Sequence, residues 1–78
     1  MRVLLFASYA DALGAPAIDL DLPPGATVRD LVHAVRALPG AGRLPPEPLV
    51  AVNLAYARGD RVLAVRDEVA LIPPVAGG

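Results

Sequence analysis

The groups with the clearest chemical potential lie at the end of this chain. The sequence closes with Gly77-Gly78, and the proline pair Pro73-Pro74 stands shortly before them. Glycine has no Cβ atom, so a Gly-Gly end can thread a narrow channel, and prolines favour an extended base that projects from the domain. This pattern predicts that the α-carboxylate of Gly78 is the reactive group, presented to another protein's active site. The segment expected to insert there is Pro73, Pro74, Val75, Ala76 and Gly77.

The remaining groups favour no catalytic centre within the chain. The sequence has one histidine, His33, and no cysteine, which excludes a cysteine nucleophile, a Cys-ligated metal and a disulfide framework. Asp67 and Glu68 are adjacent, and adjacent residues of a strand point to opposite faces. A turn is therefore a better interpretation of this acidic pair than a general acid and base. A stand-alone enzyme is the weakest hypothesis.

Length and composition limit the class of protein further. A chain of 78 residues is one small domain, and 55% hydrophobic with 19% charged residues argues against intrinsic disorder. A net charge of −1 disfavours a nucleic-acid partner. The apolar runs are too short for a membrane span, and the opening residues make a poor signal peptide. We therefore expect a cytoplasmic protein that contacts no membrane.

Hydrophobic spacing predicts the elements of the fold. Short apolar or alternating runs predict strands at Val3–Ala7, Ile18–Leu22, Leu49–Asn53 and Val69–Ile72, and a shorter edge strand at Arg61–Ala64. Apolar residues at helical spacing predict one long helix, capped by Thr27 and ended by Pro39-Gly40. The run Ser8–Gly14 predicts a short helical turn.

The order of these elements predicts an α+β fold. Two strands, a crossing helix and further strands favour a small mixed sheet with the one main helix on one face, which is the β-grasp or ubiquitin-like architecture. Residues 1–72 would form this domain, and residues 73–78 would form a flexible, extended C-terminal tail.

Three of the predicted strands are apolar on both faces, although one helix can cover only one face of a sheet. Monomers seldom leave a large apolar patch open to water, so we expect a protein partner on the helix-free face. The candidate contact residues for this partner are Phe6, Tyr9, Tyr56 and Arg61.

Three sequence blocks resemble the MoaD/ThiS family of ubiquitin-like sulfur carriers. The blocks are Val3–Ala7 with Leu13-Gly14, the pair Val52-Asn53, and the closing run from Asp67 to Gly78. The closing run is the most specific of the three. The chain departs from the usual family pattern at Ala10-Asp11 in the opening turn and at Val65-Arg66 before the acidic pair.

The resemblance implies a mechanism and a set of partners. An E1-like activating enzyme would use ATP and magnesium to adenylate the Gly78 carboxylate, and a sulfur donor would convert it to a thiocarboxylate. The chain itself would bind no cofactor and no metal. It would serve as the non-catalytic, sulfur-donating small subunit of molybdopterin synthase, in a heterotetramer with two large subunits, and would supply sulfur for the dithiolene of the molybdenum cofactor.

Other functions remain open on the sequence alone. A sibling carrier for thiamin thiazole or for tRNA thiolation would share the tail and its activation. A ubiquitin-like modifier would instead join its terminal glycine to lysines of target proteins. A passive β-grasp interaction module would leave Gly78 as a plain carboxylate.

Overall fold

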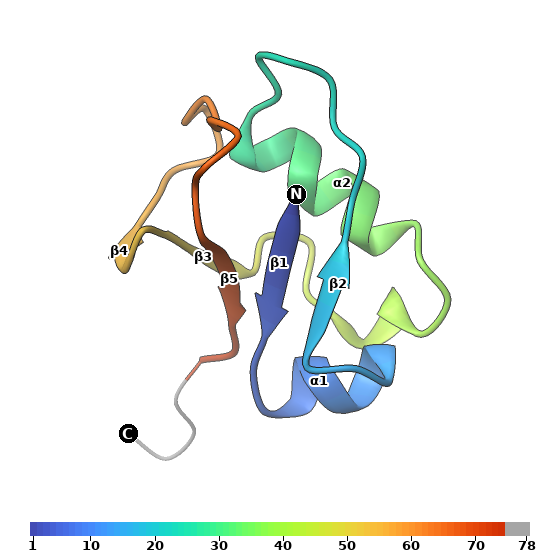
Figure 1. Ribbon diagram of the computed structural model, residues 1–78. Helices are drawn as coiled ribbons and strands as arrows, with labels where there is room; N and C mark the ends of the chain where they lie inside the picture. Colours follow the sequence, from blue (N-terminus) through green and yellow to red (C-terminus); the bar gives the residue numbers. More distant parts are fainter. Residues whose placement is uncertain (75–78) are drawn as a thin grey trace.

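The computed structural model describes residues 1–74, in which five strands form one mixed sheet and a helix packs across one face (Figure 1). The strands are β1 (Arg2–Leu5), β2 (Ala17–Asp19), β3 (Leu49–Val52), β4 (Ala55–Tyr56) and β5 (Val69–Ile72). Their order across the sheet is β2-β1-β5-β3-β4. The central pair, β1 and β5, is parallel, and every other pair is antiparallel. The predicted β-grasp sheet with one main helix is confirmed.

The main helix begins where the sequence predicts. Helix α2 (Val28–Arg36) has Thr27 as its N-cap. Thr27 Oγ1 accepts a hydrogen bond from the Asp30 N–H at 3.3 Å, and Asp30 Oδ2 accepts one from the Thr27 N–H at 3.0 Å. This reciprocal pair satisfies two backbone donors that the first turn of a helix otherwise leaves open. These hydrogen bonds to Thr27 also lower the pKa of Asp30.

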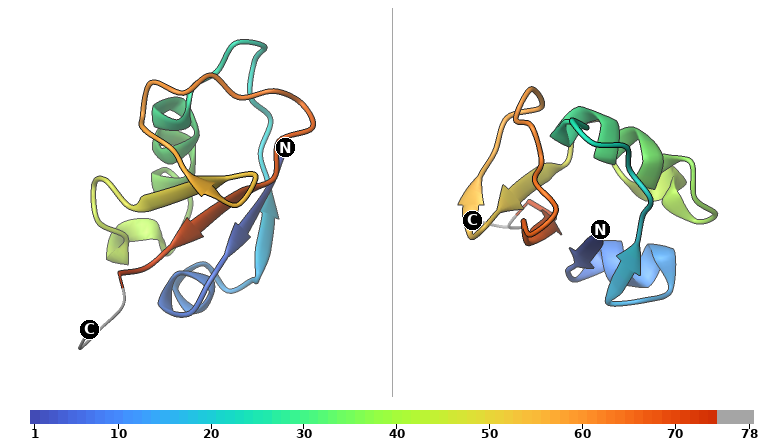
Figure 2. Two further views of the ribbon diagram at one scale, coloured as in Figure 1. Left: turned by 90° about the vertical axis from the view of Figure 1, so that its left-hand side faces the viewer. Right: turned by 45° about the horizontal axis from the view of Figure 1, so that its top comes forward.

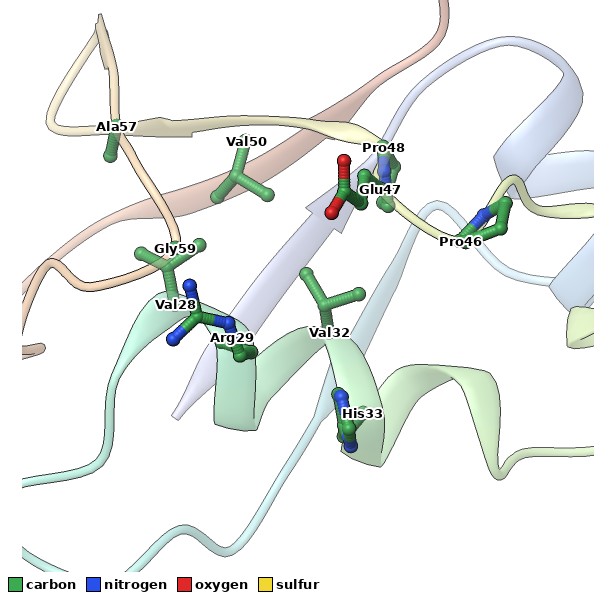
Figure 3. A pocket seen from close by; sticks show the side chains of 10 residues that line it. All are labelled: Val28, Arg29, Val32, His33, Pro46, Glu47, Pro48, Val50, Ala57 and Gly59. Carbon is green, nitrogen blue, oxygen red and sulfur yellow. The ribbon is translucent and has the colours of Figure 1, made fainter.

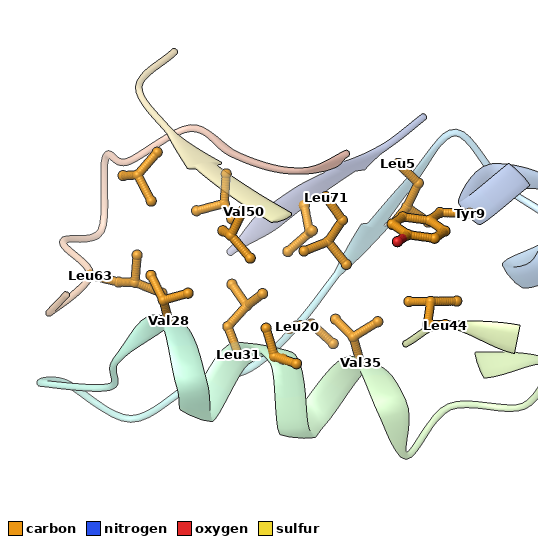
Figure 4. Packing of buried hydrophobic residues seen from close by; sticks show 14 residues of the cluster. Leu5, Tyr9, Leu20, Val28, Leu31, Val35, Leu44, Val50, Leu63 and Leu71 are labelled. Carbon is orange, nitrogen blue, oxygen red and sulfur yellow. The ribbon is translucent and has the colours of Figure 1, made fainter. Parts of the chain in front are cut away.

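A single apolar core lies between α2 and the sheet (Figure 4). The helix contributes a stripe of buried side chains at helical spacing, and strands β1, β3 and β5 contribute alternate residues from one face. The largest fully buried side chains are Leu31, Leu71, Val3, Val35, Val52 and Val69. The apolar stripe of the helix and the apolar positions of the strands therefore meet in one layer. Among residues 1–74, no helix covers the opposite face of the sheet (Figure 2).

Two smaller helices lie near the tail end of the sheet. Helix α1 (Ser8–Leu13) confirms the predicted helical turn and ends at Gly14, whose φ of 76° is easily adopted by a residue without a Cβ atom. The 3₁₀-helix η1 (Ala41–Arg43) packs beside α1. Within residues 1–74, none of the helices has the length and apolar character that crossing a membrane requires.

Three predicted strands end earlier than expected, the third being β3, which ends at Val52 and not at Asn53, and one predicted strand is wrong. Strand β1 stops at Leu5 because the chain turns at Ala7, which has a φ of 48°. Strand β2 stops at Asp19. The run Arg61–Ala64 forms only an isolated bridge, between Val62 and Thr27, because its backbone groups bond to the chain around the start of α2 instead of to a sheet edge.

The structure corrects the expected surface position of Tyr9. This side chain is 5% exposed and packs in the core near Leu5 and Leu44 (Figure 4). Its position in α1 turns the ring inward, where burial raises the pKa of the phenol. The hydroxyl group is buried and has no hydrogen-bond partner among the described residues.

Replacing Tyr9 by phenylalanine is expected to stabilise the chain. Tyr9→Phe keeps the ring in the core and removes the unpaired hydroxyl, whose burial costs about 1–3 kcal/mol. The free energy of unfolding, measured by urea titration at pH 7, should rise by about 1 kcal/mol. Tyr56→Phe, which changes an exposed tyrosine, is the control. A lower stability for Tyr9→Phe would show that the hydroxyl does have a partner.

Candidate functional site

Strand register places a row of apolar side chains on the helix-free face. Leu4 of β1 pairs with Ala17 of β2 and with Ala70 of β5, and Ala70 pairs with Ala51 of β3. Ala51 in turn pairs with Tyr56 of β4. Directly paired residues point to the same side of a sheet, so this row crosses all five strands.

A second apolar group lies on the same side, closer to the end of β5. Leu49 pairs with Ile72, and Phe6 directly follows the inward-facing Leu5 at the end of β1. Phe6 is 48% exposed, Leu49 46% and Tyr56 72%. We call the combined surface the apolar face; its residues are Leu4, Phe6, Ala17, Leu49, Ala51, Tyr56, Ala70 and Ile72. This arrangement matches the helix-free apolar surface that the strand patterns predict.

The tail begins beside this face. Strand β5 lies in the centre of the sheet between β1 and β3, and it ends at Ile72, opposite Leu49. Pro73 is half-buried and Pro74 is exposed. The other predicted tail residues, Val75, Ala76, Gly77 and Gly78, lie outside the described residues. A protein that covers the apolar face would therefore also meet the root of the tail.

The other predicted contact residues occupy different positions. Tyr56 belongs to the apolar face, whereas Tyr9 lies in the core. Arg61 is exposed, and its carbonyl oxygen accepts a hydrogen bond from the Val28 N–H at the start of α2. It is not part of the strand register that forms the apolar face.

A hydrogen-bonded brace connects the start of β5 to the end of β3. Asn53 Nδ2 donates to Asp67 Oδ1 at 2.8 Å, and Asn53 Oδ1 accepts from the Glu68 N–H at 2.9 Å. The Asn53 N–H also donates to the Glu68 carbonyl oxygen at 2.8 Å. Asp67 Oδ2 accepts from the Ala64 N–H at 2.7 Å. These bonds hold β5 in register, and thereby hold the root of the tail in place.

The brace explains the acidic pair of the sequence. Asp67 closes the turn that begins at Ala64, so the turn forms with Val65-Arg66 at its tip. The backbone N–H of Ala64 and the side-chain amide of Asn53 stabilise the ionised carboxylate and lower the pKa of Asp67. Asp67 therefore has a structural role in a turn.

A groove that sequence reasoning did not identify lies between α2 and β3 (Figure 3). It has a volume of about 470 Å³. Its floor is apolar, and three side chains, Arg29, His33 and Glu47, carry the polar groups of its lining. Within residues 1–74, no group of three or more histidine or acidic residues could hold a metal ion.

Comparison with known proteins relates the whole chain to sulfur carriers. The model of the ThiS family matches residues 3–78. A molybdopterin synthase sulfur carrier subunit from Arabidopsis thaliana is 33% identical over 79 residues, which cover 100% of this chain and 82% of that protein. A molybdopterin synthase sulfur carrier subunit from Dictyostelium discoideum is 33% identical over 81 residues, which cover 99% of this chain and 94% of that protein.

Among solved structures, the chain is similar to SAMP1 from Haloferax volcanii. The TM-score is 0.82 at 31% sequence identity, and the match covers 99% of this chain and 97% of SAMP1. A second solved structure, that of small archaeal modifier protein 1 from H. volcanii, gives a TM-score of 0.81 at 30% identity over 95% of each chain.

Because of the brace, we predict that the stability of an Asp67→Asn variant depends less on acid pH than the stability of the parent chain. Because the folded state lowers the pKa of Asp67, its contribution to stability is present above the unfolded pKa and is lost as the pH falls through the folded pKa. The variant should be less stable than the parent near pH 7. Its stability should also fall less steeply between about pH 5 and about pH 3. Urea titrations across this range measure both effects.

Asp21→Asn is the matched control, since Asp21 is an exposed carboxylate outside the brace. An Asp67→Asn variant with the acid profile of the parent would show that the brace does not depend on the ionised carboxylate.

Proposed function

Because this chain belongs to the ThiS family, we propose that it is a sulfur carrier and the small subunit of a molybdopterin synthase. The observation that carries the proposal is the identity of 33% over the full chain to two molybdopterin synthase sulfur carrier subunits. Two features of the chain support it: the Gly77-Gly78 end, and an apolar face beside the root of the tail.

The first step of the proposed chemistry activates the terminal carboxylate. A carboxylate is a poor electrophile, whereas a mixed anhydride with phosphate is a good one. An oxygen of the Gly78 carboxylate attacks the α-phosphorus of ATP on an activating enzyme, and magnesium pyrophosphate leaves. The product is an acyl-adenylate at Gly78, and this step needs no acid or base from the carrier.

The second step exchanges oxygen for sulfur. Hydrosulfide attacks the acyl carbon, the bond to AMP breaks, and AMP departs with the bridging oxygen while one proton is released. The carrier then ends in a thiocarboxylate. If the donor is a protein persulfide, an acyl disulfide forms first, and a thiol must cleave its S–S bond to release the same product.

Delivery depends on the apolar face and the tail together. A large synthase subunit that covers the apolar face would also receive the tail. The tail starts at Pro73, directly after β5, which is the middle strand of the sheet. The thiocarboxylate sulfur would then attack a carbon of the pterin precursor, form a C–S bond and displace an oxygen leaving group. Water would hydrolyse the resulting thioester, which leaves the sulfur on the pterin and returns Gly78 to a carboxylate. Each carrier delivers one sulfur, so a dithiolene needs two such transfers. Burial of Phe6, Leu49 and Tyr56 would stabilise the complex by removing apolar area from water.

A second candidate function is protein modification. The chain is 31% identical to SAMP1, a small archaeal modifier protein, over nearly its whole length. A modifier would use the same acyl-adenylate but would pass the acyl group to a lysine of a target protein. Sibling carriers for thiamin thiazole or tRNA thiolation would share the first two steps and differ in the acceptor.

The tail tests the proposed function directly. Deletion of Gly78, or addition of one alanine after it, should abolish molybdopterin formation, because either change moves the carboxylate relative to the root of the tail. The assay combines the chain with the large subunit, the activating enzyme, ATP, magnesium, sulfide and the pterin precursor. Urea midpoints and binding to the large subunit should stay close to those of the parent chain.

Val65→Ala is the control variant, because Val65 is 94% exposed in the turn before β5 and is not part of the tail. Full activity of the alanine-extended chain would rule out the carboxylate of Gly78 as the required sulfur attachment point.

A further inference from the structure

The end of the helix-free face away from the tail root carries a row of charges of both signs. Arg2 of β1 pairs directly with Asp19 of β2. On the other side of β1, the parallel register that pairs Val3 with Val69 places Arg2 beside Glu68 of β5. The three charged residues are exposed, and their side chains make no hydrogen bond to any part of residues 1–74. The row therefore presents one cation between two carboxylates.

The apolar face begins directly beside this charged row. Leu4 lies two residues after Arg2, on the same side of β1, and it pairs with Ala70 of β5. A hollow at this end of the sheet is lined by residues of both kinds: Arg2, Leu4, Arg66, Asp67 and Glu68. The charged row and the apolar face therefore form one continuous surface.

A surface with both signs of charge suits a partner that carries the same charges in reverse order. A second copy of this chain meets that condition, because a two-fold axis brings one surface against itself. If the axis runs along the strands between β1 and β5, β1 of each copy lies opposite β5 of the other. Arg2 of each copy then faces Glu68 of the second copy, and two oppositely charged pairs form.

We propose that the helix-free face binds a second copy of this chain in this two-fold arrangement. The inference does not depend on the sulfur chemistry of the proposed function. In the apolar row, Leu4 of each copy lies opposite Ala70 of the other, and Ala17 lies opposite Ala51. Two packed sheets lie about 10 Å apart, a gap that an arginine and a glutamate side chain can bridge together.

Other two-fold arrangements of this face lose one of these matches. An axis through β1 places Arg2 opposite Arg2, and an axis through β5 places Glu68 opposite Glu68, which brings like charges together. An axis between β2 and β1 pairs Arg2 with Asp19, but it overlaps only these two strands because β2 is an edge strand. An axis across the strands lays the charged row over Leu49 and Ile72, where the charges would lose water without gaining a partner.

The size of the overlap predicts a weak, reversible dimer. Four strands of each copy overlap, which makes a footprint roughly 19 Å wide, and the span from Arg2 to Phe6 makes it roughly 13 Å long. This footprint of about 250 Å² is well below the roughly 800 Å² per partner of a standard stable interface. The dimer should therefore form at high concentration and dissociate on dilution. It would compete with the large subunit of the proposed function for the same face.

The mass of the chain in solution tests the dimer first. Sedimentation velocity of the untagged full chain, from about 10 μM to about 1 mM, should show the weight-average mass rising from 8.0 kDa toward twice that value. The rise should be smaller at high salt, which screens the ion pairs. A mass that stays at 8.0 kDa at every concentration and at low salt would overturn the inference.

Charge reversal tests the arrangement of the two copies. Arg2→Glu brings two carboxylates together at each contact, and Glu68→Arg brings two guanidinium groups together, so each variant alone should lose the dimer. An equal mixture of the two variants should regain it, because every contact between unlike copies then joins a carboxylate to a guanidinium group. The brace uses the backbone N–H and carbonyl of Glu68, so it does not require the native side chain.

Arg43→Glu and Glu47→Arg are the matched controls, because they change the net charge by the same amounts. Arg43 lies in η1, and Glu47 lines the groove on the helix side of the sheet. Each control should dimerise like the parent chain, alone and mixed, and urea midpoints confirm that all four variants are folded. The inference fails if Arg2→Glu and Glu68→Arg associate no more in a mixture than alone. It also fails if the control pair gains as much association on mixing.

Discussion

The parallel pairing of β1 with β5 is the contact on which the other features depend. It joins the first and last strands of the chain at the centre of the sheet, with Val3 and Leu5 opposite Val69 and Leu71. All four side chains are buried against α2. Because β5 lies between β1 and β3, the tail begins at the middle of the sheet. A protein that covers the apolar face would therefore also contact the root of the tail.

The brace and the apolar face follow from this pairing. Asn53 and Asp67 fix the register of β5, which determines that Ala70 and Ile72 face away from the helix while Val69 and Leu71 face the core. A shift of the β5 register by one residue would turn Ala70 and Ile72 toward the core and Val69 and Leu71 toward the helix-free face. The same register sets Glu68 beside Arg2 and creates the charged end of the face. One hydrogen-bonded brace therefore supports the core, the candidate interface and the root of the tail.

Much of the fold can be predicted from short stretches of the sequence, because the interactions that form these elements join residues close together in the chain. The reciprocal cap of Thr27 and Asp30 and the helical stripe of α2 depend on residues close in sequence. Strand β1 was predicted too long because nothing in the sequence marks Ala7, an alanine, as the site of a turn with positive φ. The burial of Tyr9 depends on η1, which is distant in sequence, and the groove between α2 and β3 is likewise formed by remote segments.

The candidate site was predictable in part for the same reason. The alternation of apolar residues indicated an uncovered face, and Tyr56 lies on it. The brace joins residues 53 and 67, whose side chains meet only because β3 and β5 are neighbours.

The most direct test of the sulfur-carrier account is the intact mass of the untagged chain after incubation with the activating enzyme, ATP, magnesium and sulfide. The account predicts the increase expected for replacement of one oxygen atom by sulfur, and its loss when Gly78 is deleted. An unchanged mass, with an activating enzyme shown to be competent on another carrier, would contradict it. That result would leave a modifier with different activation or a binding module.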